Sequence, residues 1–192
     1  IIISDYAKGL VRRDLSTSII QMAKEKGIFI CIDPKGKDFT RYRGADAITP
    51  NQREAEEVCG FQLEGEESLQ RAVQILIQQT EAQGVLITRG KNGISYYVRE
   101  GKELKTISSD AREIYDVTGA GDTVVSTFTL AFIESKSWED SIQIANRAAG
   151  IVVGRIGAAT VTREELINSY EEKNQATKGK LFEIGMLLTV IS

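Results

Sequence analysis

Histidine is absent from this chain of 192 residues. A Ser-His-Asp or Cys-His nucleophile system and a histidine-ligated zinc site all need an imidazole, so the sequence excludes them. Cysteine is scarce. Cys31 and Cys59 lack the spacing of a metal site, and so sparse a pair does not predict a disulfide framework. We interpret both as reduced thiols of the core, where a free cysteine behaves as a small hydrophobic side chain.

Positive charge is not in excess either, because 24 lysine and arginine residues stand against 27 acidic ones and give a net charge of -3. This balance gives no electrostatic reason to expect nucleic acid or an anionic membrane as a partner. The apolar run in "KLFEIGMLLTVIS" is shorter than the roughly 20 residues that a membrane span needs. No basic-then-apolar signal peptide opens the chain, so we expect a cytoplasmic protein.

Short apolar runs alternate with segments whose apolar residues follow helical spacing. Predicted strands cover residues 1–4, 28–33, 46–50 and 84–90, with predicted helices within 10–27, 51–58 and 68–84. Residues 93–100 and 102–108 flank Gly101 and predict a hairpin. The alternation predicts an α/β layer fold with a mostly parallel sheet, which binds ligands beyond the carboxyl ends of its strands.

Capping residues mark where several of the helices begin. Thr49 and Pro50 predict an N-cap and a first-turn proline for the helix that starts near residue 51. Ser137 is the predicted cap of a later helix, and Thr162 with Glu165 has the pattern of a capping box for the last one.

The stretch "DVTGAGD", residues 116–122, carries the most specific chemistry. Gly119, Ala120 and Gly121 lie where a loop enters a helix that we predict to be buried on nearly every face. Glycines let backbone N–H groups turn outward, and the helix start adds unpaired N–H groups, so this loop is suited to a phosphate or an oxyanion.

Asp122 at the rim of this loop would repel a phosphate unless the carboxylate has a task. Accepting the proton of a hydroxyl that attacks phosphorus is such a task, while the loop stabilises the transferring phosphoryl group. The alternative is an ordinary acidic residue in the first turn of a helix, favoured by the helix dipole.

Two common phosphate motifs are not matched. Gly90 and Lys91 precede Asn92, where a P-loop needs serine or threonine. The run from Gly119 to Gly121 reaches Val124, where a dinucleotide fingerprint needs a third glycine, and no acidic residue follows at the end of a second strand. A dinucleotide-binding oxidoreductase domain therefore stays open as an alternative with a partial motif.

Several segments in the same order resemble the ribokinase-like sugar kinases. "DVTGAGD" resembles their C-terminal signature, and "ANRAAGIVVGRIGAATVT" resembles the segment that closes over the nucleotide base. "TPNQREAE" is similar to their N-x-x-E motif, with Asn51 and Glu54 in the matching places. "TRGKNG" is similar to their T-x-G-x-x-G turn, matching Thr88, Gly90 and Gly93.

The resemblance implies a three-layer αβα ribokinase-like fold and a kinase that uses ATP and Mg²⁺. It implies Asp122 as the general base, residues 119–121 as the anion hole, and Glu54 on Mg²⁺ through water. The other implied positions are Asn51, Gln52, Arg53, Thr88, Gly90 and Gly93 for the nucleotide phosphates or ribose, Asn146 for the adenine, and Asp116, Thr118 and Gly157 for a monovalent cation such as K⁺. Helix-start chemistry for Asn51 and Glu54, a simple turn at Thr88 and a solvated Asn146 are the alternatives.

Within that family, "SDYAKG", "DPKGKDFTRYRGADAITPN" and "YDVTGAGDTV" most resemble the kinase domains of bacterial heptose 7-phosphate kinases. This implies phosphorylation of D-glycero-β-D-manno-heptose 7-phosphate at its anomeric hydroxyl, on the ADP-heptose route to the lipopolysaccharide core. Lys8, Lys35 and Arg41 are our candidates for the sugar's 7-phosphate or for ATP, against the alternative of solvated surface charges. Lys35 is favoured because it directly follows a predicted strand.

The family's glycine-pair sugar motif and small β lid are not found in this sequence. We therefore expect only the C-terminal, nucleotide-binding part of a kinase at residues 1–170, with a linker or aberrant tail at 171–192. A catalytically dead, truncated module is the third hypothesis. The partners that we expect are a sugar phosphate and ATP, with a homodimer as a further prediction and with neither nucleic acid nor membrane.

Overall fold

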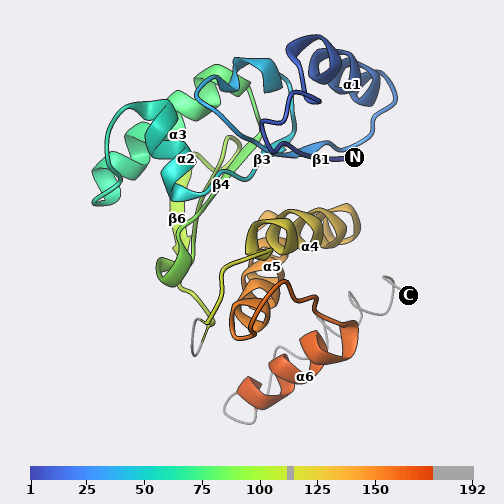
Figure 1. The fold of residues 1–192 in the computed structure, drawn as a ribbon, viewed down its shortest axis with the longest axis vertical. Helices are drawn as coiled ribbons and strands as arrows, with labels where there is room; N and C mark the ends of the chain where they lie inside the picture. The colour runs from blue at the N-terminus through green and yellow to red at the C-terminus, as the bar shows by residue number, and fades with distance from the viewer. Residues whose placement is uncertain (112–114, 175–192) are drawn as a thin grey trace. The chain divides into compact units, whose positions relative to one another are not determined.

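The computed structural model describes residues 1–111 and 115–174, with side chains as far as Glu171 (Figure 1). Contacts divide the chain into two compact units, Ile1–Ser108 and Ser109–Ser192, called unit 1 and unit 2 below. The segment that we predicted as a tail begins inside a helix that continues to Asn174, and the rest of it lies outside the described residues.

Unit 1 is built on a six-stranded sheet whose strands follow one another in chain order. The first four strands pair in parallel, and the last two add antiparallel neighbours. The strands are β1 (Ile2–Ser4), β2 (Cys31–Asp33), β3 (Ala47–Ile48), β4 (Gly84–Thr88), β5 (Ile94–Val98) and β6 (Glu103–Ile107). The helices are α1 (Arg13–Glu25), α2 (Gln52–Cys59) and α3 (Glu66–Thr80), with short 3-10 turns η1 (Phe39–Tyr42) and η2 (Gly90–Asn92).

The helices α1, α2 and α3 lie on the same side of the sheet (Figure 1). Parallel crossovers are right-handed, and a strand order that advances in one direction therefore puts every crossover helix on one face. The core under these helices is formed by alternate strand residues and by the apolar faces of the helices. Its buried members include Ile3, Ile32, Ile48, Val85 and Ile87 from the strands and Ile20, Ala55, Val73 and Leu76 from the helices.

The predicted strands and hairpin match the observed β1 to β6, but the start of α2 differs from our prediction. Asn51, not Thr49, is the N-cap. Thr49 still belongs to the sheet, where its N–H pairs with the Ile32 carbonyl at 3.0 Å and its hydroxyl donates to the Asp33 carboxylate, so its side chain does not reach the first turn of α2. Pro50 likewise stays outside the helix, where its carbonyl accepts the Thr88 N–H.

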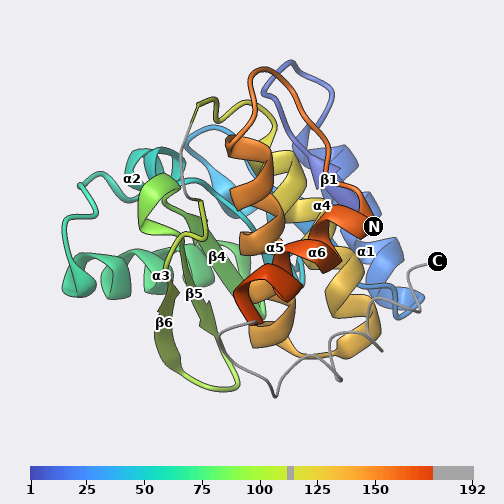
Figure 2. The same ribbon diagram turned by 90° about the horizontal axis from the view of Figure 1, so that it is seen from below.

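The described part of unit 2 consists of three helices, α4 (Ala120–Ser135), α5 (Trp138–Val153) and α6 (Arg163–Asn174), seen in Figure 2. α4 and α5 form a hairpin in which Trp138 stacks near Phe128 and Phe132, with ring centroids 5.5 and 4.7 Å away. The prediction that α4 is buried on nearly every face is wrong, because Leu130 and Ile133 are 52% and 44% exposed.

The predicted caps of the later helices are confirmed. The Asp140 N–H donates to the Ser137 hydroxyl at 3.3 Å at the start of α5. Before α6, Thr162 and Glu165 exchange two hydrogen bonds, each side chain accepting the N–H of the other residue. These caps satisfy N–H groups that a helix start leaves without intrahelical partners.

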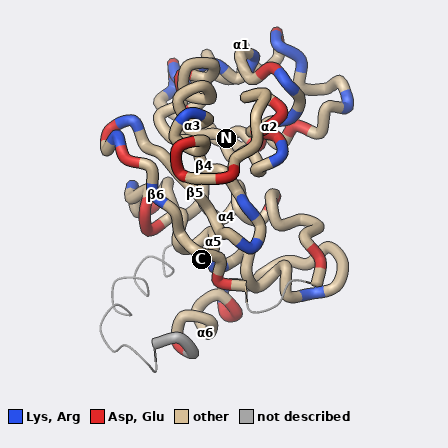
Figure 3. Tube along the Cα trace, turned by 90° about the vertical axis from the view of Figure 1, so that its left-hand side faces the viewer, with Lys and Arg blue, Asp and Glu red and all other residues tan. Residues whose placement is uncertain are grey.

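Basic and acidic residues are both spread over the described trace in Figure 3, with uncharged stretches between them. None of the described helices has the length and apolar character that crossing a membrane requires.

The two cysteines are free thiols, with Cys31 buried and Cys59 half-buried, and burial raises the pKa of the Cys59 thiol to about 11. A thiol with so high a pKa carries little reactive thiolate at neutral pH.

Candidate functional site

The carboxyl ends of the parallel strands in unit 1 bring polar residues from distant parts of the sequence together. Asp5 follows β1, and its N–H pairs with the carbonyl of Asp33 at the end of β2, at 3.0 Å. The Thr49 hydroxyl after β3 donates to the Asp33 carboxylate at 3.4 Å. This is the edge at which α/β sheets bind their ligands.

Two predicted nucleotide residues, Asn51 and Glu54, form a capping box at the start of α2. The Glu54 N–H donates to the Asn51 side chain at 3.0 Å, and the Asn51 N–H donates to the Glu54 carboxylate at 2.8 Å. The second Glu54 oxygen accepts the ammonium group of Lys35. Asn51 and Glu54 therefore do cap a helix, as the alternative interpretation predicts. Glu54 in addition forms an ion pair with Lys35.

The other predicted residues of α2 are engaged within the helix itself. The Gln52 amide donates to Glu56 at 2.9 Å, and Arg53 pairs with Glu57 at 3.3 Å, one turn further along. Contacts of this kind stabilise a helix modestly. The placement of Gln52 and Arg53 at the nucleotide stays a prediction.

Thr88 at the end of β4 lies beside Asn51, with which it forms an isolated parallel bridge. The turn that follows has positive φ at Gly90 and Gly93, 55° and 80°, a region that favours glycine. It is closed by the Arg89 N–H on the Gly93 carbonyl, at 2.8 Å. The structure therefore brings the predicted T-x-G-x-x-G turn next to the start of α2.

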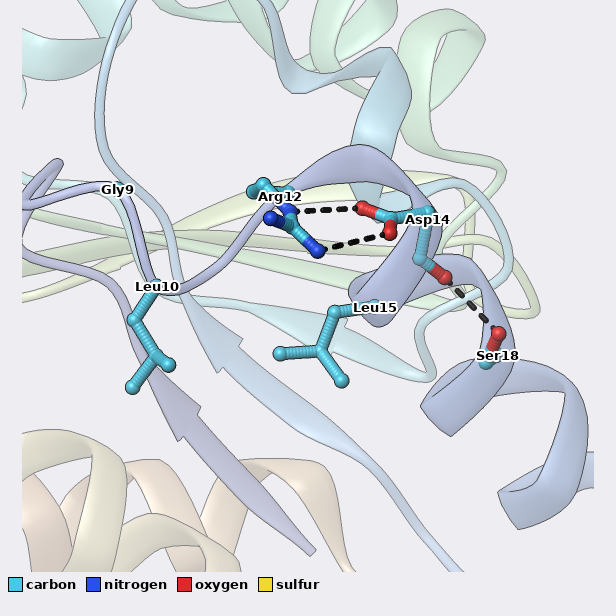
Figure 4. Close-up of a pocket in the computed structure, with 6 residues that line it drawn as sticks. All are labelled: Gly9, Leu10, Arg12, Asp14, Leu15 and Ser18. Atoms are coloured by element: carbon cyan, nitrogen blue, oxygen red, sulfur yellow. Dashed lines mark hydrogen bonds and ion pairs between the residues drawn. The ribbon is translucent and has the colours of Figure 1, made fainter.

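The candidate phosphate cations Lys8 and Arg41 differ in their surroundings. The Arg41 guanidinium pairs with the buried Asp5 carboxylate at 2.9 Å. Lys8 lies in the exposed loop after β1. The residue that follows it, Gly9, lines a hollow together with Leu10, Arg12, Asp14, Leu15 and Ser18 (Figure 4). In that hollow Arg12 is already bound by Asp14 through two hydrogen bonds.

Unit 2 contains the predicted anion loop. Gly119 has φ of 81° and caps α4, so the chain enters the helix through a left-handed residue. The Asp116 carboxylate accepts the N–H of Thr118 at 2.8 Å and the N–H of Gly157 at 3.1 Å. The three residues predicted for a monovalent cation are therefore joined to one another, and they tie the loop before α4 to the turn after α5.

Asp122 is exposed in the first turn of α4, directly after the residues predicted as the anion hole. Asn146 is only 4% exposed within α5, so the alternative of a solvated asparagine does not describe it. The hydrogen bonds from Thr118, through its side chain and its N–H, hold the pKa of the Asp116 carboxyl below its ordinary value, and the Gly157 N–H adds to this effect.

Sequence reasoning missed two residues at this strand edge, Asp5 and Tyr42. Asp5 is almost fully buried, accepts hydrogen bonds from Ala7 and Tyr42 and forms an ion pair with Arg41. The available signal was an aspartate placed directly after a strand, in "SDYAKG". No local sequence pattern predicts a role for Tyr42, which is 37 residues from Asp5 in the sequence and stands in no recognisable motif.

The residues present fit Mg²⁺ in one way. No cluster of three or more potential ligands occurs within residues 1–111 and 115–174, so an all-protein cage is not formed there. Mg²⁺ usually keeps several waters and uses one or two carboxylates together with substrate phosphates. Glu54 suits that role through water, since each of its oxygens already accepts a hydrogen bond.

Comparison with curated proteins finds long relatives that share most of this chain. The Bifunctional protein HldE of Syntrophotalea carbinolica is 45% identical over 166 residues, which cover 86% of this chain and 34% of that protein. The proteins of the same name from Geobacter metallireducens and Coxiella burnetii are 39% and 41% identical and cover 100% and 99% of this chain. The chain spans 39% of the length of each of these two relatives.

Solved structures share the fold. A ribokinase from Arabidopsis thaliana, complexed with ribose and ATP, is 25% identical with a TM-score of 0.74, covering 82% of this chain and 52% of that one. Phosphofructokinase-2 from Escherichia coli, in complex with potassium, is 20% identical with a TM-score of 0.76, covering 89% and 56%. The ribokinase-like fold predicted from the sequence is thereby confirmed.

The sequence also matches the group described as pfkB family carbohydrate kinase over residues 2–165. This match covers the strand-edge residues of unit 1 and the anion loop of unit 2. The chain belongs to the pfkB family of carbohydrate kinases.

Proposed function

We propose that this chain is the nucleotide-binding part of an ATP-dependent sugar kinase, and that its substrate is D-glycero-β-D-manno-heptose 7-phosphate. The observation that carries the proposal is the start of α4, where the left-handed Gly119 leads into a helix of 16 residues with Asp122 in its first turn. A helix start offers unpaired N–H groups and partial positive charge to an anion. The shared length and identity with HldE proteins support the choice of substrate.

Asp122 accepts the proton of the sugar's anomeric hydroxyl as that hydroxyl attacks the terminal phosphorus of ATP, giving the 1,7-bisphosphate and ADP. The N–H groups of residues 119–121 stabilise the negative charge on the transferring phosphoryl group, for which the Ala120 N–H turns away from the Val117 carbonyl, its partner at 3.2 Å in this structure. Both contributions are electrostatic and depend on a fixed loop. The hydrogen bonds of Asp116 to Thr118 and Gly157 supply that rigidity.

Glu54 would hold Mg²⁺ through water, and the metal would neutralise phosphate charge when bound. Asn51, Thr88, Gly90 and Gly93 serve the phosphates or ribose of the nucleotide in this proposal, and Asn146 serves the adenine. A monovalent cation beside Asp116, Thr118 and Gly157 is supported only by a structural neighbour whose description names potassium.

The cytoplasmic location and the homodimer are part of the same proposal. Solved neighbours include a ribokinase with ribose and ATP, which supports small molecules as the partners. The route to ADP-heptose follows from the likeness to HldE proteins, which supports this place in metabolism.

The decisive test replaces Asp122 by Asn in the native protein that contains this chain. Since a positioned general base contributes about 10² to 10⁴-fold, we expect kcat to fall by about that factor. The affinity for Mg²⁺·ATP, measured by calorimetry, should stay close to that of the unaltered protein. Asp140→Asn, in the first turn of α5, is the matched control because Asp140 has the same relation to a helix dipole.

Normal turnover by the Asp122→Asn variant would contradict the general-base role and favour the helix-dipole alternative. Titration with NADH separates the oxidoreductase hypothesis from the kinase. Binding of NADH without binding of Mg²⁺·ATP would overturn the kinase proposal altogether. Binding of ATP with no turnover of any sugar phosphate would favour the catalytically dead module.

A further inference from the structure

The backbone of Lys35, just after β2, is held by two consecutive residues of η1. Its N–H donates to the Tyr42 hydroxyl at 3.1 Å, and its carbonyl accepts the Arg41 guanidinium. Both polar groups of one exposed loop residue are thus fixed by side chains from the same short turn. Because its backbone is fixed at both polar groups, the Lys35 side chain extends from a fixed Cα position.

The two side chains that hold Lys35 are in turn anchored on Asp5. The Tyr42 hydroxyl donates to the Asp5 carboxylate at 2.6 Å, and the Arg41 guanidinium pairs with the same oxygen at 2.9 Å. Asp5 and Tyr42 are 4% and 0% exposed. We call Asp5, Arg41 and Tyr42 the Lys35 anchor.

The burial of the Asp5–Arg41 ion pair in the anchor costs desolvation free energy. Taking a carboxylate and a guanidinium out of water is compensated only by good geometry and by additional hydrogen bonds. Asp5 accepts two hydrogen bonds, from the Tyr42 hydroxyl and from the Ala7 N–H at 2.8 Å, beside its ion pair with Arg41, whose buried Nε has no hydrogen-bond partner. A buried ion pair contributes little net stability by itself. What Asp5 does in this structure is to hold the two side chains that fix the Lys35 backbone.

Gly36 shows that the close approach of Arg41 is built into the sequence. Its φ is 91°, and a Cβ placed there would lie 3.3 Å from an Arg41 nitrogen. A larger residue would be strained in that conformation and would press on the guanidinium. The glycine therefore lets the anchor reach the Lys35 carbonyl.

The Lys35 ammonium group ends at the Glu54 carboxylate, at the start of α2. The Glu54 side chain is 9% exposed, while that of Lys35 is 46% exposed. The carboxylate is therefore fixed and the lysine head remains accessible to solvent. Glu54 also lies beside the predicted phosphate turn, because its capping partner Asn51 bridges to Thr88.

We propose that Lys35 is a phosphate-binding residue of the nucleotide site, positioned by the Asp5–Arg41–Tyr42 anchor and held at Glu54 until the nucleotide binds. This rests on the proposed function, which makes Glu54 the residue that holds Mg²⁺ through water. Lys35 then gives up its place at Glu54 and its ammonium group pairs with a phosphate oxygen. In the same proposal Arg41 positions Lys35 and does not contact a phosphate, and Lys35 serves ATP, not the 7-phosphate of the sugar.

The test measures the affinity for Mg²⁺·ATP by calorimetry in the native protein. Lys35→Met should raise the Kd about tenfold, the loss expected for one charge-assisted hydrogen bond. Lys37→Met is the matched control, because Lys37 is an exposed lysine two residues along the same loop. It should leave the Kd unchanged within about twofold.

Positioning is tested by Tyr42→Phe, which removes the hydroxyl that accepts the Lys35 N–H and donates to Asp5. This variant should raise the Kd by a smaller factor, and the Lys35→Met, Tyr42→Phe double variant should bind no more weakly than Lys35→Met alone. Lys35→Arg should recover part of the lost affinity, since it restores the charge. A merely structural contact would lower the thermal stability of Lys35→Met without changing the Kd.

Equal Kd values for Lys35→Met and the unaltered protein would overturn the inference and leave the proposed function standing. Strictly additive effects of Lys35→Met and Tyr42→Phe on the binding free energy of Mg²⁺·ATP would contradict the claim that the anchor positions Lys35. If the unaltered protein bound no Mg²⁺·ATP, the proposed function would fail and the inference with it.

Discussion

Asp116 is the residue on which the geometry of the anion loop depends. One carboxylate oxygen accepts the N–H of Thr118 in the loop, and the other accepts the N–H of Gly157, which is 41 positions further along the chain. An amide has only one oxygen and cannot accept on both sides. An asparagine at this position would turn its own N–H groups toward one of the two donors.

Asp116→Asn should therefore lower the melting temperature at pH 7. Because Thr118 and Gly157 lower the folded-state pKa of Asp116, the contribution of this carboxylate is present above its ordinary pKa of about 3.9 and is lost as the pH falls through the lowered value. The difference between the variant and the unaltered chain should narrow as the pH is reduced from 5 toward 3. Thermal unfolding followed by circular dichroism at each pH measures this.

The control for that experiment is Glu171→Gln, which removes an exposed carboxylate of α6. It should alter the melting temperature little at any pH. A melting-temperature difference between Asp116→Asn and the unaltered chain that stays constant from pH 7 to 3 would contradict the role given to the Asp116 carboxylate.

Local signals in the sequence predicted the parts of the site that are local in the structure. Glu54 lies one helical turn from Asn51, and a turn motif that includes Thr88 is readable from neighbouring residues. The Lys35 anchor could not be predicted in this way, because Asp5 and Tyr42 meet only after β1, β2 and η1 have been arranged by the sheet. An aspartate and a tyrosine separated by 37 residues carry no local pattern.

At the scale of elements, α4 shows why hydrophobicity alone predicted too much burial. The helix is apolar on most faces, yet Phe128 is fully buried while Leu130, two residues along, is 52% exposed. Successive helix residues are rotated by about 100° about the helix axis, so residues two positions apart lie on nearly opposite faces of the helix. Composition therefore predicted an apolar helix correctly, and only the packing of the tertiary structure decides which face is covered.

Phe128→Ala should destabilise the chain by about 3 to 5 kcal/mol, because it leaves a cavity where an aromatic ring was fully buried. Leu130→Ala on the same helix should change stability by no more than about 0.5 kcal/mol. Trp138, the single tryptophan, lies 5.5 Å from Phe128 and reports the unfolding of this hairpin by fluorescence. Similar losses for both variants in denaturant titrations would show that the covered face of α4 has been assigned wrongly.

At the scale of the whole molecule, exposed apolar side chains gather on α4. Leu130 and Ile133 are 52% and 44% exposed, and because they are three residues apart they share one face of the helix. The strand β6 differs, since it carries Glu103 and Lys105, and charged side chains of this kind discourage pairing with another chain. An exposed apolar face favours association with another chain.

We therefore expect the homodimer to form through the exposed face of α4. Leu130→Lys should shift the sedimentation velocity distribution toward the monomer, because a charge opposes the burial of that face. Ile156→Lys is the control, since Ile156 is 89% exposed in the turn after α5 and lies outside α4. If both variants dissociated the chain equally, general solubility and not the face of α4 would be the cause. If neither did, the homodimer prediction would need a surface other than the exposed face of α4.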